Sequence, residues 1–447
     1  MNCKRTACAM LVAALPLTAH AANWLQLQGT EGKNTPAYKF WGFVQPTYVY
    51  NFGDPVTGLA GAPAITSYNG RDALFNLVGP AQKDESKFQF NRARLGVRGA
   101  INDKINYFVL AELGDNGLTR EDDVVLSDWS VTFNHLPRAR IRVGQFKLPL
   151  GEEALQAVQV MDYVNFTSVT DGLLLERRVR PNAPAAGRSF NVAPGLNAAR
   201  VVDSVGGFRD IGVQVFDWWQ GAGQWEYAYA VMASQGDGLN IIGDDYGKWD
   251  VSGRLQAAYV FGGKGPRRQD AVMYAWYQTG ERRFAGDDYD RTRYGLGANA
   301  RRGKWRAGGE YLAGKGMIFN GVNPPFKDAG APGFQPTAMV GLDNDNEADG
   351  FYLDAGYKVL PKLELDVRYD QYNRLTNSAP GERTFKTWTV GAQYFFKPTL
   401  RLGLNYEFRS LDVANPGAIA NPVQRANAQT IADAMDDRVS LQLTWIF

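Results

Sequence analysis

The sequence predicts an all-β protein, a transmembrane antiparallel β-barrel of about sixteen strands with a long third loop folded into its lumen. Three observations favour this class. The last ten residues alternate between apolar and polar side chains, the amino terminus has the features of an export signal, and short and long connections alternate between the candidate strands. Alternation alone leaves a soluble β-sandwich open, because periodicity does not say which face meets water and which meets lipid.

The carboxy-terminal strand presents one wholly apolar face. Side chains point to opposite faces of a strand in turn, so Val439, Leu441, Leu443, Trp445 and Phe447 lie together. An aromatic last residue that completes such a stripe resembles the assembly signal of bacterial outer-membrane barrels. We therefore expect a lipid-facing strand here.

Residues 1–21 read as a secretory signal peptide. Lys4 and Arg5 precede an apolar run, and Ala19-His20-Ala21 is a small-residue cleavage site. Cleavage after Ala21 predicts export through the periplasm to the outer membrane of a bacterial cell. It leaves residues 22–447 as one barrel domain, and we see no linker that would separate a second one.

The exported chain is electrically balanced and free of thiols. Without Lys4 and Arg5 it carries 46 basic and 46 acidic residues. Both cysteines, Cys3 and Cys8, lie in the signal segment, which excludes a disulfide scaffold. No later segment approaches the roughly 18 consecutive apolar residues of a membrane helix, so any membrane span must consist of strands.

Composition favours a barrel over an enzyme. The chain holds 49 Gly, 24 Phe, 21 Tyr and 11 Trp, as in barrels with aromatic girdles. His135 is the only histidine of residues 22–447 and lies at an expected turn. An outer-membrane hydrolase would usually need a histidine beside a nucleophile. We expect no enzyme activity; a hydrolase and a structural or adhesive barrel are the less favoured alternatives.

Sixteen segments have the length of a tilted membrane strand. They lie near residues 37–52, 88–101, 104–114, 124–135, 138–147, 208–219, 224–233, 248–260, 270–280, 291–301, 303–313, 350–359, 362–373, 384–396, 399–409 and 438–447. Short connections such as 102–103, 135–137, 221–223, 360–361 and 397–398 alternate with long ones at 53–87, 148–207, 314–349 and 410–437. Membrane barrels show this pattern because periplasmic turns are short and extracellular loops long.

Several strands back an apolar row with a basic row. Arg92, Arg94 and Arg98 alternate with Leu95 and Val97, and the same basic pattern recurs at Arg138, Arg140 and Arg142 and at Arg291, Arg293 and Arg301. An arginine facing lipid at mid-depth costs about 2–4 kcal/mol, so these rows are expected to line the lumen. Near Phe90 the parity breaks, because Phe88 and Phe90 share the parity of Arg92. This predicts either a bulge or an inward aromatic pair, while strand 270–280 fits either orientation.

A sixteen-stranded barrel with a polar interior is a water-filled pore. The inward positions of the clear strands hold seventeen basic and ten acidic residues, so a net positive wall is predicted. Rings of Arg and Lys favour anions, and the arginine fork suits phosphate oxygens. The alternative is that each arginine pairs with an acid on a neighbouring strand and only solvates the wall.

The segment 148–207 is too long for an ordinary loop and is expected to narrow the barrel as a constriction. It begins just after Lys147. Its first half carries acids such as Glu152, Glu153 and Asp162, and its later half is basic, with Arg177, Arg178 and Arg180. An extracellular lid without a filter role is the alternative.

Three motifs resemble the phosphate-selective porin O and P family. They are Phe90-Asn91-Arg92-Ala93-Arg94-Leu95-Gly96-Val97-Arg98-Gly99, Arg142-Val143-Gly144-Gln145-Phe146-Lys147-Leu148-Pro149 and Leu175-Glu176-Arg177-Arg178. The resemblance implies a homotrimer of sixteen-stranded barrels, each passing anions through an arginine-lined passage with an inserted third loop, and no enzymatic activity. Where the family commonly has Glu-Arg-Ser, this chain has Glu176-Arg177-Arg178.

Together these observations predict an outer-membrane porin for passive diffusion of small anions, phosphate or related oxyanions. The expected pore-lining and anion-binding residues are Arg92, Arg94, Arg98, Arg138, Arg140, Arg142, Lys147, Arg177, Arg178, Arg180, Arg291 and Arg293. A general or carboxylate-preferring porin is the alternative. The expected partners are small anions, outer-membrane lipid with lipopolysaccharide, and two further copies of the chain. We expect no cofactor, metal or nucleic acid.

Two further features allow sharper interpretations that we do not favour. Asp343, Asp345, Glu347 and Asp349 alternate like calcium ligands but lack the glycine and the terminal glutamate of a calcium loop, so a solvated loop is expected. The aromatic set around Trp218, Trp219 and Trp225 is expected to form an interfacial girdle, with a sugar-stacking path as the alternative.

Overall fold

The computed structural model describes residues 23–28, 30, 35–53, 56–59, 86–119, 124–179, 201–236, 248–263, 265–284, 287–323, 337–341 and 344–447. The expected signal peptide, residues 1–21, lies outside the described residues.

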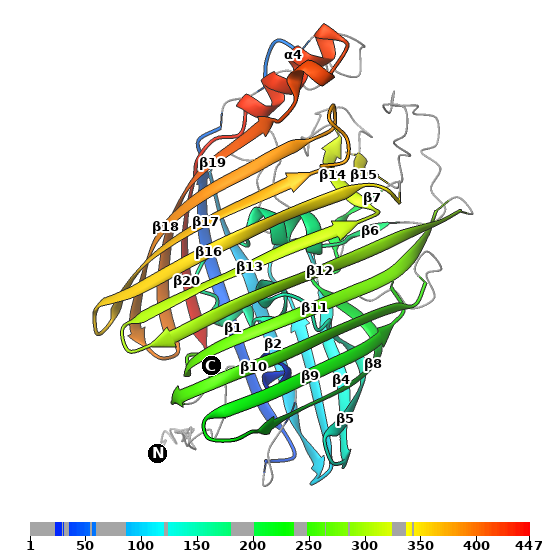
Figure 1. Cartoon of the computed structure of the whole chain (residues 1–447). Coiled ribbons are helices and arrows are strands. Elements are labelled where there is room, and N and C mark those ends of the chain that lie inside the picture. The colour runs from blue at the N-terminus through cyan, green and yellow to red at the C-terminus, as the bar shows by residue number, and fades with distance from the viewer. Residues whose placement is uncertain are drawn as a thin grey trace, which may run out of the picture.

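Sixteen strands form one closed antiparallel barrel (Figure 1). Closure comes from β1, which pairs with β2 on one side and with β20 on the other. All sixteen strands predicted from the sequence are present. They are β1 (Lys39–Asn51), β2 (Ser86–Asn102), β3 (Ile105–Glu112), β4 (Val125–Leu136), β5 (Ala139–Lys147), β8 (Arg209–Gln220), β9 (Trp225–Ser234), β10 (Asp250–Gly262), β11 (Gln269–Phe284), β12 (Asp287–Arg302), β13 (Trp305–Lys315), β16 (Glu347–Leu360), β17 (Leu363–Arg374), β18 (Arg383–Lys397), β19 (Leu400–Val413) and β20 (Arg438–Ile446).

The remaining elements belong to the connections. The amino-terminal helix α1 (Trp24–Leu27) precedes the barrel, and α3 (Glu152–Leu155) with short helical turns at Val158–Val160 and Thr170–Leu174 follows β5. A small sheet of order β14-β15-β7-β6 joins β6 (Arg177–Val179), β7 (Val201–Val205), β14 (Ile318–Asn323) and β15 (Thr337–Gly341). A turn at Pro416–Ala418 and α4 (Pro422–Asp433) connect β19 to β20. Within the described residues, none of the helices has the length and apolar character needed to span a bilayer.

The barrel strands bury polar side chains and expose apolar ones. In β2, Arg92 and Arg94 are buried, whereas Leu95 is 53% exposed. In β12, Arg291 and Arg293 are buried, whereas Leu296 is 63% exposed. A soluble sandwich shows the opposite pattern, with its apolar row inside. The exposed apolar row therefore suits lipid contact, and the basic rows face the interior as the sequence predicted.

A β-bulge resolves the parity break near Phe90. The register of β1 and β2 pairs Gln45 with Arg92 but Pro46 with Phe90, so Asn91 is one residue too many. Pro46 has no N–H to give to the ladder, and proline within sheets is found at edges and bulges. The extra residue places Phe88 and Phe90 on the exposed face while Arg92 stays inside. A bulge, rather than an inward aromatic pair, is the correct interpretation.

The orientation of 270–280 is also settled. Tyr274, Trp276 and Gln278 of β11 are buried, whereas Met273 and Tyr277 are exposed. Met273 and Tyr277 thus face outward, and two large aromatic side chains fill the interior beside β10 and β12.

Candidate functional site: the charged interior of the barrel

A cluster of basic side chains forms where β2, β5 and β8 face the interior. We call Arg92, Arg94, Lys147 and Arg209 the basic cluster; each is at most 5% exposed. The register places Lys147 of β5 directly opposite Arg209 of β8. Like charges directly opposite one another destabilise a strand pair. The rest of the fold must therefore hold Lys147 and Arg209 together against their electrostatic repulsion.

Two carboxylates neutralise half of the basic cluster. Arg94 Nε donates to Glu112 Oε2 at 2.6 Å, its cross-strand partner on β3. Arg209 Nε donates to Asp128 Oδ2 on β4 at 3.0 Å. The four basic side chains thus share two carboxylates, and neither Arg92 nor Lys147 is paired with one of them.

Arg92 and Lys147 have neutral partners. Arg92 Nη1 donates to the side-chain oxygen Oε1 of Gln45 at 3.1 Å, and Lys147 Nζ donates to the carbonyl of Gln156 at 2.6 Å. Among the residues that the structure describes, no carboxylate forms an ion pair with either side chain. Both cations also interact electrostatically with Arg94 and Arg209. The basic cluster is therefore the part of the wall best suited to receive an anion.

The second arginine row, on β5, is arranged differently. Arg140 forms an ion pair with Asp217 at 3.0 Å and lies over the Trp218 ring at 4.2 Å. Arg142 is fully buried and lies over the Phe216 ring at 4.4 Å. Arg138 does not line the interior as predicted: it occupies the turn before β5, with φ of 60°, and is exposed. The hairpin between β4 and β5 turns there, so the strand begins one residue later than the parity argument assumed.

Arg98 approaches the β5 row, as its position on β2 suggested. Its guanidinium lies over the Phe108 ring at 5.5 Å and interacts electrostatically with Arg142. Both side chains contact the amino-terminal segment: Arg98 Nη1 donates to the carbonyl of Leu27 at 3.3 Å, and Arg142 Nη2 donates to the carbonyl of Leu25 at 3.4 Å.

Arg291 and Arg293 of β12, which the sequence predicted to line the pore, bind other segments of the chain. Arg291 donates to Gln278 at 2.8 Å and forms an ion pair with Glu176 at 3.3 Å. Arg293 donates to backbone carbonyls, among them that of Leu173 at 3.0 Å and that of Met317 at 2.7 Å. With its donors directed at carbonyls, Arg293 serves to position these segments.

Three predicted residues of the later loop are not placed at a site. Arg177 and Arg178 lie on β6, whose side chains the structure does not describe, and Arg180 lies outside the described residues. Asp343 of the acidic stretch is also outside them. Among the described residues, no group of three or more histidine, cysteine, aspartate or glutamate side chains could hold a metal ion.

The segment 148–176, which we call the inner segment, is tied to the wall by its acids. Glu152 pairs with Arg254 of β10 at 2.9 Å. Glu153 pairs with Arg368 of β17 at 3.0 Å. Similar contacts complete the set: Asp162 with Arg267, Arg301 and Arg306, Glu176 with Arg282, and the amides of Asn165 and Ser168 with Glu407 and Asp370.

The electrostatics of these ion pairs favours ionised carboxylates on the inner segment. Burial raises the pKa of Asp162, but the guanidiniums of Arg306, Arg267 and Arg301 outweigh burial and hold the pKa well below its usual range. Burial likewise raises the pKa of Glu176, and nearby arginines, Arg282 first, outweigh it and lower the pKa to about 2. Both carboxylates are charged at neutral pH and draw the inner segment onto the wall.

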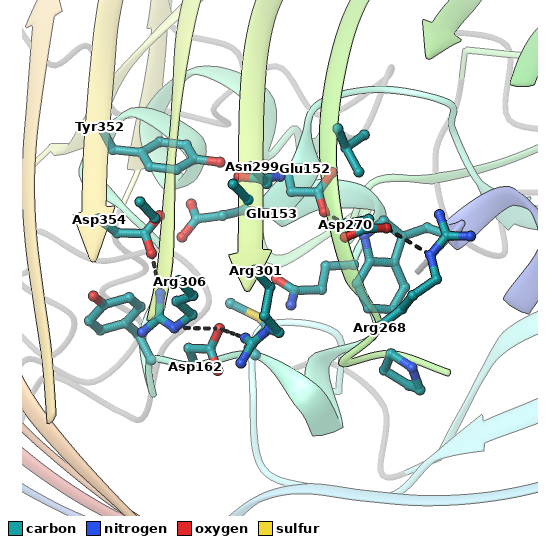
Figure 2. Close-up of a pocket in the computed structure, with 18 of the residues that line it drawn as sticks. Glu152, Glu153, Asp162, Arg268, Asp270, Asn299, Arg301, Arg306, Tyr352 and Asp354 are labelled. Atoms are coloured by element: carbon teal, nitrogen blue, oxygen red, sulfur yellow. Dashed lines mark hydrogen bonds and ion pairs between the residues drawn. The ribbon is translucent and has the colours of Figure 1, made fainter. Parts of the chain in front are cut away.

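A cavity of about 110 Å³ lies between the inner segment and the wall. Figure 2 shows Asp162 between Arg301 and Arg306, with Asp354 on the far side of Arg306 and the pair of Arg268 and Asp270 across the cavity. The lining holds five acids and four arginines: Glu152, Glu153, Asp162, Asp270, Asp354, Arg268, Arg301, Arg306 and Arg368. This half of the interior therefore carries both signs of charge. It fits the alternative interpretation, in which the arginines of the wall pair with acids.

Sequence reasoning missed several of these residues. Arg209 begins a strand just after Gly207-Phe208, where φ is positive at both residues, so its parity could not be read. Arg267 and Arg268 lie in the turn before β11, yet both reach interior carboxylates. The adjacency Arg267-Arg268 in a turn was the available signal, and the parity argument covered strands only.

The comparison with protein families matches the geometry. Residues 69–190 match the model of the phosphate-selective porin O and P family. Together with the closed sixteen-stranded barrel, this match supports an outer-membrane porin. The matched stretch includes β2 to β5 and the inner segment, and so all of the basic cluster except Arg209.

Two solved structures of outer-membrane proteins share the fold, and a third is less similar. The anion-selective porin from Comamonas acidovorans is similar with a TM-score of 0.52 at 12% identity, over 92% of this chain and 99% of that chain. A loop L8 deletion mutant of OmpT, an outer membrane protein of Vibrio cholerae, gives a TM-score of 0.50 at 9% identity, over 92% and 99%. The outer membrane channel DcaP of Acinetobacter baumannii gives 0.48 at 14% identity, over 94% and 99%. None of the curated proteins matches the chain.

Proposed function

We propose that this protein is an outer-membrane porin that passes small anions, phosphate or related oxyanions, by passive diffusion and that the basic cluster is its anion-binding site. The observation that carries the proposal is the opposition of Lys147 and Arg209, beside Arg92 and Arg94, with only Glu112 and Asp128 as paired carboxylates. An arriving anion supplies the negative charge that this cluster lacks.

The chemistry of the cluster suits oxyanions. Arginine presents a planar fork that matches phosphate or carboxylate oxygens, and lysine adds a compact charge. Burial makes each interaction stronger than it is in water. Conduction also requires exit, so binding must remain weak. The neighbouring carboxylates Glu112 and Asp128 serve this purpose, because they reduce the net charge of the cluster.

The inner segment supplies the constriction in this proposal. Its acids contact β10, β11, β12, β13 and β17, and its amides contact β17 and β19. Lys147 also donates to the carbonyl of Gln156, which lies on this segment. A segment that reaches so many inward-facing rows fits a position across the lumen, with the basic cluster on one side and the mixed cavity on the other. The expected constriction at 148–207 is supported here by its first half.

A general or carboxylate-preferring porin is the second candidate. The mixed charge of the cavity favours it, because five acids and four arginines beside one another do not select strongly by sign. The two candidates differ in how strongly phosphate blocks a chloride current. The anion-selective porin from Comamonas acidovorans, which shares the fold, supports anion preference in either case.

The homotrimer implied by the family resemblance is also proposed, with outer-membrane lipid and lipopolysaccharide around it. Each barrel already pairs β1 with β20, so the pore is complete within one chain. Mass measurement of the detergent-solubilised protein tests the trimer without bearing on selectivity.

The deciding experiment is the reversal potential of the purified porin in a planar bilayer across a potassium chloride gradient, followed by phosphate addition. A potential of anion sign with phosphate block supports the oxyanion proposal. Anion sign without block supports the general porin. A potential of cation sign overturns both, because the acids of the inner segment would then control permeation.

A further inference from the structure

The amino-terminal segment folds onto two arginines of the proposed anion path. It comprises residues 23–28, with α1, and Thr30. Arg98 donates to the carbonyls of Leu27 at 3.3 Å and Thr30 at 3.4 Å. Arg142 donates to the carbonyl of Leu25 at 3.4 Å and to the Thr30 hydroxyl at 3.3 Å. Both guanidiniums therefore converge on the same short stretch of chain.

Apolar packing fixes this segment inside the barrel. Trp24 is 3% exposed and Leu25 is 1% exposed, and both pack in one cluster with Leu155 of the inner segment and Phe216 and Ala228 of the wall. Apolar packing therefore holds Trp24 and Leu25 in place in addition to the hydrogen bonds from the arginines.

Polar contacts join the segment to the inner segment. Trp24 Nε1 donates to Glu152 Oε1 at 2.5 Å, and Gln28 Nε2 donates to the carbonyl of Leu155 at 3.0 Å. Glu152 in turn pairs with Arg254 of β10. The amino-terminal segment and the constriction are thus one connected structure.

The contacts to Arg142 are weak for a buried cation. Its oxygen acceptors are neutral and lie at 3.3–3.4 Å, whereas a guanidinium binds ionised oxygens at about 2.7–2.9 Å. Its Nη1 has no partner among the described residues. The charge of Arg98 lies near enough to act on it. An oxyanion would be the stronger ligand at this position.

We propose that residues 23–28 with Thr30 act as an amino-terminal plug, an internal ligand whose carbonyl and hydroxyl oxygens occupy Arg98 and Arg142 and compete with small oxyanions for them. This inference rests on the proposed function and deepens it by adding its regulation. The plug lowers resting conductance and limits anion binding at the end of the barrel near α1. Displacement of the plug frees Arg98 and Arg142 and opens a second anion-binding site beside the basic cluster.

The first test is the double variant Trp24→Ala with Leu25→Ala, recorded as single channels in planar bilayers. We expect higher conductance and phosphate block at about tenfold lower concentration, the change that corresponds to the loss of about one or two net hydrogen bonds from the competitor. Trp305→Ala is the matched control, because Trp305 is 64% exposed on the outer face. Unchanged conductance and unchanged block in the folded double variant would overturn the plug.

A deletion of residues 23–30 that keeps residues 1–22 gives an independent test. We expect the deletion to conduct more, and we expect a synthetic peptide of residues 23–30 to restore the lower conductance. The matched control peptide carries alanine at Trp24 and Leu25 and should have no effect. Equal effects of both peptides, or of neither, count against the plug.

The two proposals fail differently. A wild-type reversal potential of cation sign overturns the anion function, yet a rise in conductance on plug removal would still support the plug as a gate. Anion sign in the wild type, with no response to plug removal, retains the function and rejects the plug.

Discussion

Lys147 and Arg209 lie directly opposite each other on β5 and β8, both buried, and only Arg209 has a carboxylate partner. Lys147 instead donates to the Gln156 carbonyl. A buried cation without a counter-ion lowers stability, so the native state carries an unfavourable term that the proposed anion binding would relieve. This relationship separates the basic cluster from Arg301 of β12 and Arg306 of β13, which both pair with Asp162.

Lys147→Gln should weaken anion binding without weakening the fold. The variant keeps a side-chain donor for Gln156 and removes the like charge opposite Arg209. Loss of one charge-assisted hydrogen bond corresponds to roughly tenfold weaker phosphate block, while the thermal midpoint should stay the same or rise. Phosphate titration of the chloride current and thermal unfolding measure the two effects.

Lys104→Gln is the matched control for this variant, because Lys104 lies exposed in the turn between β2 and β3. A fall in block of equal size in both variants would mean that general surface charge, rather than the basic cluster, sets the affinity.

Asp162→Asn should loosen the inner segment. Asp162 pairs with Arg267 at 2.6 Å, with Arg306 at 3.1 Å and with Arg301 at 3.3 Å, and its removal leaves these cations with less counter-charge. Removing one partner of a buried pair costs about 3–5 kcal/mol; Glu364 also pairs with these arginines, so the lower end is expected. Thermal unfolding and protease cleavage within 148–176 are the readouts.

The control for Asp162 is Asp433→Asn at the exposed end of α4. It should leave both readouts unchanged. Resistance of the Asp162 variant to protease, equal to that of the wild type, would show that the remaining tethers suffice and that the ion pairs of Asp162 do not position the segment.

Acid should release the inner segment over a defined range. The folded pKa of Glu176 is lowered to about 2, against about 4.3 for a free glutamate. A lowered pKa means that the contribution of Glu176 to stability is complete above the unfolded value and is lost as pH falls through the folded value. The pKa of Asp162 is lowered too, so both tethers weaken together in acid.

Channel recordings at stepwise lower pH test this release. Conductance fluctuations should stay constant down to about pH 4.3 and grow toward about pH 2, where Glu176 becomes protonated. The Glu176→Gln variant should already show part of these conductance fluctuations at neutral pH. Noise that begins above this range in the wild type would point to other titrating groups.

The sequence predicted the barrel because strand parity is local. The alternation of Arg92, Arg94 and Leu95 indicates inward and outward rows within a single strand. Local patterns of this kind and strand length predicted all sixteen strands, although 270–280 fitted either orientation. Pairing is not local. That Arg94 meets Glu112 while Arg92 meets Gln45 depends on register, which the sequence of one strand does not state.

The inner and amino-terminal segments were the least predictable parts. Trp24 and Leu25 form too short an apolar pair to signal burial, and their place is set by Leu155 and Phe216, far away in sequence. Arg138 was misplaced because the turn between β4 and β5 includes it, so its side chain does not follow the alternation of the strand. Contacts between distant segments, rather than patterns within one, decide which arginines remain available to an anion.

The bulge at Asn91 gives the last prediction. Neither polar atom of the Asn91 side chain has a hydrogen-bond partner among the described residues, whereas its backbone carbonyl accepts from Asn116 at 2.6 Å. The residue therefore acts by its presence, since it lets Phe88 and Phe90 face outward while Arg92 faces inward.

Asn91→Ala should leave the barrel intact, because the inserted residue and its carbonyl remain. Deletion of Asn91 should turn either the two phenylalanines inward or the arginine row outward, because a one-residue slip exchanges the faces of a strand. We expect the deletion to abolish the fast-migrating folded band on unheated gels, and equal migration of the deletion and the alanine variant would show that the bulge does not set the parity of β2.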